Sequence, residues 1–89
     1  MSYTYEFGEA ALAQFRALDP WLAEETLDEL ESLLQNPPLT RRRIAGMVVH
    51  DFSRIRGTDI AYVFLTIVVN RERSVLYIRS VGSYSRSSL

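Results

Sequence analysis

With 89 residues, the chain has room for one modest hydrophobic core, so we expect a single domain over residues 1–89. There is no cysteine and only one histidine, which excludes disulfides and thiolate metal sites and argues against a histidine-based metal site. No apolar run reaches the roughly 18 residues that a membrane span needs, and the N-terminus lacks the pattern of a secretory signal. The sequence therefore favours a cytoplasmic protein with no metal and no other cofactor.

Charge is divided unevenly along the chain. Residues 1–40 carry a net charge of −7 and residues 41–89 a net charge of +6, and every basic residue is arginine. The planar guanidinium group binds phosphate and carboxylate groups in bidentate fashion. Two interpretations follow: the basic half meets an anionic partner, or the two halves pair within the molecule.

The N-terminal stretch alternates aromatic and polar residues from Tyr3 to Phe7, which predicts a half-buried strand. Gly8 ends this strand. Residues 9–18 then place apolar side chains at helical spacing, with Glu9 in the first turn, where the helix dipole favours an acid. A first helix is therefore expected over residues 9–18.

A second helix is predicted from Pro20 to Gln35. Asp19 suits the N-cap, and a proline at the first helical position loses no hydrogen bond. The connection between the helices is so short that they should form a hairpin. Asn36 and the two prolines after it end the second helix. Its acidic side chains should lie on a solvated outer face, opposite an apolar stripe of Ala23, Leu27, Leu30 and Leu34 that Trp21, Leu22 and Leu33 widen.

Residues 60–70 should form the central strand of a sheet. The run is rich in β-branched and aromatic residues, and only Thr66 interrupts it before Asn70. Apolar residues fall on both parities, so we expect both faces of this strand to be covered.

Two further strands flank this central one. The first is expected over residues 47–55, with a bulge at Asp51-Phe52, where the alternation slips. The last is expected over residues 74–81, ended by Gly82 and followed by a polar tail over residues 83–89. Short turns join these strands into an antiparallel meander. The predicted fold class is α+β, with an N-terminal strand and a helical hairpin packed on a small, twisted, mostly antiparallel sheet (β-α-α-β-β-β).

Several stretches in this order resemble the RelE/ParE superfamily of bacterial toxin–antitoxin proteins. They are Tyr5-Glu6-Phe7, the helical pattern of Ala11, Phe15 and Leu18, and the segments 33–37, 44–47, 60–64 and 78–82. The resemblance covers nearly the whole chain. It implies the toxin of a type II toxin–antitoxin module, which inhibits growth and is neutralised by a cognate antitoxin.

In the RelE-like branch, the resemblance implies ribosome-dependent cleavage of mRNA. An activated 2′-hydroxyl attacks the neighbouring phosphate, cations stabilise the developing charge, and an acid protonates the leaving oxygen. The chain departs from this branch at Ala61, where a basic residue is usual, and at Ser83-Tyr84-Ser85-Arg86, a segment that is usually more basic. These departures leave the presence of nuclease activity open.

Candidate site residues can still be named. A phosphate clamp from Arg54, Arg56 and Arg79, with Tyr84 or His50 as proton donor, contains the groups that the chemistry needs. The candidate catalytic residues are Arg54, Arg56, Arg79, Tyr84 and Arg86, and the candidate RNA-binding residues are Arg41, Arg42, Arg43 and His50. Each has a structural alternative: a solvated strand residue, a packing residue, or for Arg79 an ion pair with Glu6 or Asp51.

A ParE-like gyrase inhibitor that acts by protein–protein contact is the main alternative, and a degenerate scaffold that only binds an antitoxin is a third. The net charge of −1 fits a protein partner better than RNA. All these interpretations imply a partner protein, with the ribosome and mRNA or gyrase as the target. An antitoxin segment would dock on the edge of the meander or on the helical hairpin near Trp21 and Leu22.

Overall fold

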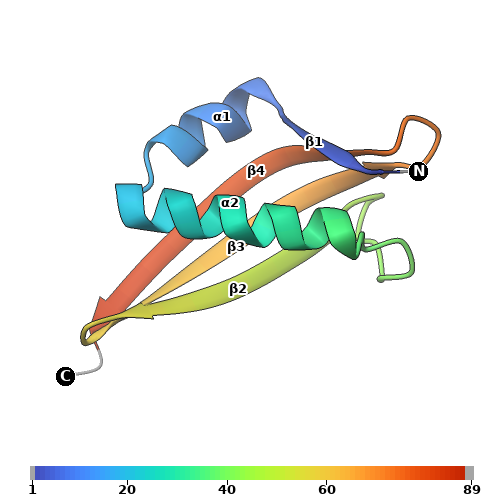
Figure 1. The fold of residues 1–89 in the computed structure, drawn as a ribbon. Coiled ribbons are helices and arrows are strands. Elements are labelled where there is room, and N and C mark those ends of the chain that lie inside the picture. The colour runs from blue at the N-terminus through green and yellow to red at the C-terminus, as the bar shows by residue number, and fades with distance from the viewer. Residues whose placement is uncertain (1, 88–89) are drawn as a thin grey trace.

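A helical layer covers one face of a mixed sheet in the computed structural model, which describes residues 2–87 (Figure 1). The strands stand in the order β1-β4-β3-β2; the last three form an antiparallel meander, and β1 runs parallel to β4 at one edge. The predicted α+β fold and element order are confirmed. The elements are β1 (Thr4–Phe7), α1 (Glu9–Arg16), α2 (Pro20–Gln35), β2 (Val48–Arg56), β3 (Asp59–Asn70) and β4 (Val75–Ser87).

The core lies between the helices and the sheet. On β3, Ala61, Val63, Leu65 and Ile67 alternate with more exposed residues and are all 0% exposed, as the two-residue period of a strand requires. From the helical layer, Leu30 is fully buried against this row of side chains. Neither described helix is long and apolar enough to cross a membrane.

The second helix has the predicted limits, but its buried face is rotated from the predicted stripe. Leu22, Thr26, Leu30 and Leu33 are buried, whereas Leu27 is 37% exposed. Thr26 can be buried because its hydroxyl donates a hydrogen bond to the Leu22 carbonyl oxygen at 2.8 Å. The first helix is shorter than predicted and ends at Arg16.

The prediction of a bulge in β2 is wrong. Its register with β3 is regular from Val48↔Ile67 to Arg56↔Asp59. The alternation looked irregular because His50 and Arg54 lie on the helix-facing side with Phe52, where polar residues were not expected. The irregularity in the sheet falls instead between β3 and β4, at Thr66/Ile67.

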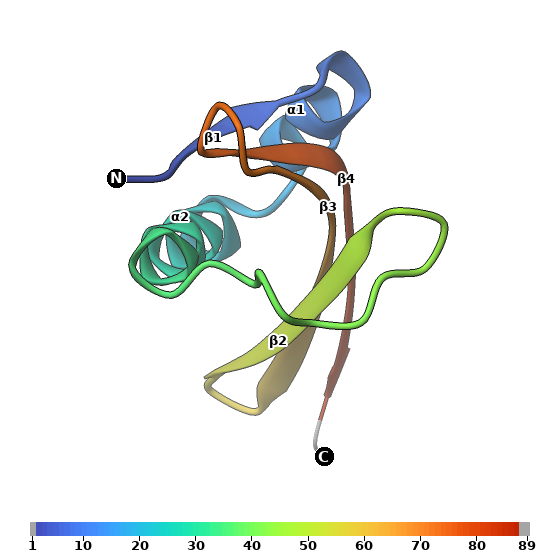
Figure 2. The same ribbon diagram turned by 90° about the vertical axis from the view of Figure 1, so that its right-hand side faces the viewer.

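The last strand is longer than predicted. It continues through Gly82 to Ser87, with Gly82 opposite Phe64 and Ser87 opposite Asp59, because the first half of β3 offers it a partner. The predicted tail over residues 83–89 is thus a strand up to residue 87, and its last two residues lie outside the described part of the chain. Figures 1 and 2 show this end of the sheet running past the helices.

The expectation that both faces of β3 are covered is also wrong. The helices cover one face only, and Figure 2 shows both of them on the same side of the curved sheet. Phe64 is 37% exposed on the other face, and Tyr62 is half-buried there. We call this uncovered surface the open face of the sheet.

Candidate functional site on the open face

Three stacked rings dominate the far end of the open face. Tyr62 and Tyr84, which oppose each other in the register of β3 and β4, have ring centroids 4.9 Å apart and ring planes at 20°. Phe64 stacks on Tyr84 at 6.0 Å and 15°. The Arg86 guanidinium carbon lies 5.8 Å from the Tyr62 ring centroid. Tyr62, Phe64 and Tyr84 are called the aromatic cluster below.

The aromatic cluster is accessible, since Tyr84 is 54% and Phe64 37% exposed. Exposed aromatic rings on a sheet can stack unpaired nucleobases, and a nearby arginine can bind the phosphate backbone. Arg79 also faces away from the helices, because it alternates with the buried Ile78. It stands on the same strand as Tyr84, roughly 16 Å away at 3.3 Å per residue.

The second strand carries Arg54 on the opposite, helix-facing side of the sheet. Its Nε donates to Glu25 Oε1 and one terminal nitrogen donates to Glu29 Oε1, both at 2.9 Å. The other terminal nitrogen donates to the Ser53 carbonyl oxygen at 3.0 Å. The hydrogen bonds that Arg54 donates to the two glutamates, above all to Glu29, raise the pKa of Arg54 against the effect of burial. Arg54 therefore ties β2 to α2.

His50 belongs to the same network. An Arg41 terminal nitrogen lies 2.7 Å from His50 Nδ1, and His50 Nε2 lies 2.6 Å from Glu29 Oε2. Since a guanidinium can only donate, Nδ1 accepts; the hydrogen is therefore on Nε2, which donates to Glu29. Burial would raise the pKa of Glu29, but hydrogen bonds from His50 and Arg54 outweigh it and lower that pKa. Arg41 also donates to the Val49 carbonyl oxygen at 2.8 Å.

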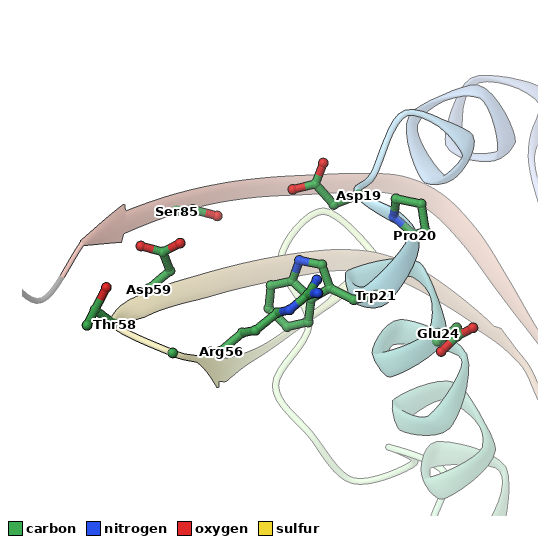
Figure 3. A pocket seen from close by; sticks show the side chains of 9 residues that line it. Asp19, Pro20, Trp21, Glu24, Arg56, Thr58, Asp59 and Ser85 are labelled. Carbon is green, nitrogen blue, oxygen red and sulfur yellow. The ribbon is translucent and has the colours of Figure 1, made fainter.

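Arg56 faces a third region, a groove of about 990 Å³ between the start of α2 and the β2–β3 turn (Figure 3). Its guanidinium carbon lies 5.5 Å from the Trp21 ring centroid. Asp19, Glu24 and Asp59 also line this groove, so its carboxylates outnumber its single guanidinium. Such a surface disfavours a phosphate.

The predicted phosphate clamp is therefore not assembled. Arg54 and Arg56 lie on the helix side of β2, whereas Arg79 lies on the open face of β4, two strands away. The predicted ion pair of Arg79 with Glu6 is absent; Glu6 lies 3.8 Å from Arg73 instead. On the open face, the structure brings the predicted residues Tyr84 and Arg86 against the same Tyr62 ring. On the helix side, it brings the predicted residues Arg41, His50 and Arg54 into one network around Glu29.

The predicted RNA-binding residues lie in two places: Arg41, Arg42 and Arg43 in the segment between α2 and β2, and His50 near the start of β2. Arg42 and Arg43 are exposed. Arg41 is hydrogen-bonded to His50 and to the Val49 carbonyl oxygen, and His50 is hydrogen-bonded to Glu29. Sequence reasoning missed Tyr62 and Phe64. The sequence did hold an indication of them. The odd-numbered positions from 61 to 69 are all aliphatic, whereas the two aromatic residues of the central strand, Tyr62 and Phe64, both stand at even-numbered positions.

Comparisons with known proteins agree with this fold. No family model matches the chain. The mRNA interferase toxin RelE of Escherichia coli K12 is 28% identical over 89 residues, which span 100% of this chain and 90% of RelE. The mRNA interferase RelE of Shigella flexneri matches equally, at 28% identity over the same shares of the two chains.

Solved structures show the same arrangement. The isolated E. coli RelE toxin superimposes with a TM-score of 0.69 at 26% identity, over 97% of this chain and 88% of RelE. The toxin–antitoxin complex RelBE2 of Mycobacterium tuberculosis gives a TM-score of 0.67 at 24% identity, over 94% of this chain and 100% of the matched chain. At this identity, the match indicates a shared fold and nothing more.

The fold and the order of elements are similar to those of solved bacterial toxins and toxin–antitoxin complexes. These relatives and structures confirm the resemblance to the RelE/ParE superfamily that the sequence stretches predicted. Within that superfamily, the relatives described above carry the RelE name.

Proposed function

We propose that this chain, as a single domain over residues 1–89, is the toxin of a type II toxin–antitoxin module and acts on mRNA in translation. The RelE relatives are mRNA interferase toxins, and E. coli RelE occurs in a complex with its antitoxin. The observation that carries the proposal is the aromatic cluster beside Arg86 on the open face.

The open face supplies specific chemical groups. A base stacked on Phe64 or Tyr84 would hold the adjacent phosphate near Arg86. The 2′-hydroxyl gives its proton to solvent water as its oxygen bonds to phosphorus, the bond between phosphorus and the 5′-oxygen breaks, and the 5′-oxygen takes up a proton. The Tyr84 hydroxyl is the proton donor within the aromatic cluster, and Arg86 stabilises the extra negative charge. The bound mRNA would therefore lie across β3 and β4, away from the helices.

A ParE-like inhibitor of gyrase is the second candidate, favoured by a different observation. Arg54, Arg56 and His50 are held on the helix side, and β2 presents two exposed apolar side chains on the open face, Ile55 at 73% and Val49 at 43%. A surface with few free cations fits a protein contact better than a polyanion. A scaffold that only binds its antitoxin would have the same features.

Induced expression in a bacterial host, with mRNA 5′ ends mapped, tests these functions. We expect growth arrest and cuts inside translated codons, both abolished by Tyr84→Ala with Arg86→Ala. Arg16→Ala, an exposed change on α1, is the matched control and should leave the arrest intact. Arrest without cuts but with DNA-damage signalling would favour gyrase. No arrest at all would contradict the toxin proposal.

A further inference from the structure

The second strand is an unpaired edge of the sheet within the described residues. It pairs with β3 on one side and has no strand on the other. Val49 and Ser53 direct their carbonyl groups to the free side, where the guanidinium groups of Arg41 and Arg54 bond them. Backbone groups of an antiparallel strand alternate in direction, so Val49, Asp51, Ser53 and Ile55 all point their backbone to this edge.

This edge has few of the features that prevent pairing. Its register is regular, with no bulge, and the strand contains no proline or lysine. The side chains of the same four residues lie on the open face. Val49 and Ile55 at its two ends are 43% and 73% exposed, so the edge is apolar at both ends and polar between them.

We propose that β2 pairs antiparallel with β2 of a second copy of this chain. One register uses all four edge residues: Val49 opposite the partner's Ile55, and Asp51 opposite the partner's Ser53. A twofold axis then passes between Phe52 and the partner's Phe52. Val49 of each copy packs against Ile55 of the other. No two like charges stand opposite each other on the open face. The two sheets become one continuous sheet.

Arg41 and Arg54, whose guanidinium groups donate hydrogen bonds to the Val49 and Ser53 carbonyl oxygens in the single chain, do not block this pairing. Arg54 keeps its bonds to Glu25 and Glu29 when it releases the Ser53 carbonyl oxygen, and Arg41 keeps its bond to His50. The partner's N–H groups then take the two carbonyl oxygens. Because the strand is only nine residues long, the interface is small and should form reversibly.

Cross-linking tests the register directly, because the chain has no cysteine of its own. In the proposed pair, residue 51 lies about 5.5 Å (Cα to Cα) from the partner's residue 53, within disulfide range. An equimolar mixture of the Asp51→Cys and Ser53→Cys chains should therefore cross-link on mild oxidation. Either variant alone should not, since its two cysteines would stand roughly 9 Å apart, beyond that range.

Sedimentation of the full chain over a concentration series tests the association. We expect a reversible monomer–dimer equilibrium that Ile55→Asp abolishes. Leu27→Asp, a change on α2 at a residue that is 37% exposed, should leave the equilibrium intact. A chain that stays monomeric throughout overturns the proposal. A dimer that forms without the mixed cross-link overturns it too, because the copies would then meet elsewhere. Neither measurement depends on toxicity.

Discussion

Glu29 is the centre of the network that holds β2 against α2, and its replacement by glutamine gives the sharpest test of the packing. The glutamate is 20% exposed and accepts hydrogen bonds from His50 at 2.6 Å and Arg54 at 2.9 Å. Glutamine keeps the volume, but its NH2 group must face one of these two donors. Hydrogen bonds to charged groups contribute about 1.5–3 kcal/mol, and partial exposure reduces this. We therefore expect a loss of about 1–2 kcal/mol at pH 7.

That loss corresponds to a fall in Tm of roughly 4–16 °C for a chain of this size. The assay is denaturant unfolding followed by the fluorescence of Trp21, the one tryptophan in the sequence. Asp28→Asn, an exposed change on the same helix, is the matched control and should cost less than about 0.5 kcal/mol.

The pH dependence follows from the lowered pKa of Glu29. A carboxyl group whose pKa is lower in the folded state stabilises the fold above its unfolded pKa, about 4.3, and loses that contribution as the pH falls through the folded value. The difference between the parent chain and Glu29→Gln should thus be constant near neutrality and shrink below about pH 4. A loss no larger than that of Asp28→Asn, or one unchanged in acid, would refute the reasoning.

Three further predictions concern the site and the core. Tyr84→Ala should weaken binding of a single-stranded RNA oligonucleotide by about 5- to 150-fold, as expected for the loss of one stacked base. Tyr84→Phe should bind normally but cleave more slowly. Equal binding by the parent chain and both variants in a filter assay would contradict this. Gly8→Ala should destabilise the fold, because the new Cβ would lie 2.6 Å from the Tyr77 hydroxyl, and adding Tyr77→Phe should restore part of the Tm. Leu30→Ala, at a fully buried position, should cost about 2–5 kcal/mol in denaturant unfolding, and a smaller loss would mean that the core collapses around the cavity.

Local signals predicted the helical layer well. Asp19-Pro20 at one end and Asn36-Pro37 at the other predicted the observed limits of α2, since proline stereochemistry acts within a few residues. Asp19 occupies the N-cap position, but its side chain makes no capping hydrogen bond. The face that α2 buries depends on the sheet below it. Thr26 is buried and Leu27 is not, and no pattern within the helix distinguishes the two positions.

Non-local pairing limited the prediction of the sheet and the site. His50 and Arg54 face the helix because Glu29, more than 20 residues earlier in the chain, provides their partner. A two-residue period treats such polar residues as irregularities, which is why a bulge was predicted. Tyr84 and Arg86 were named from the sequence, but Tyr62 was read as a covered core residue because its exposure depends on what the helices leave open.

The overhang of β4 beyond Gly82 divides the molecule into two zones that should exchange amide hydrogens at different rates. Residues 83–87 are exposed and have no helix over them, whereas Leu76 and Ile78 on the same strand are fully buried. Amides near Leu76 should exchange only on global unfolding, and those near Tyr84 through local opening. Since Tyr84, one of the three rings of the aromatic cluster, stands on the fast-exchanging zone, a ligand bound there would be detected first as slowed exchange over residues 83–87.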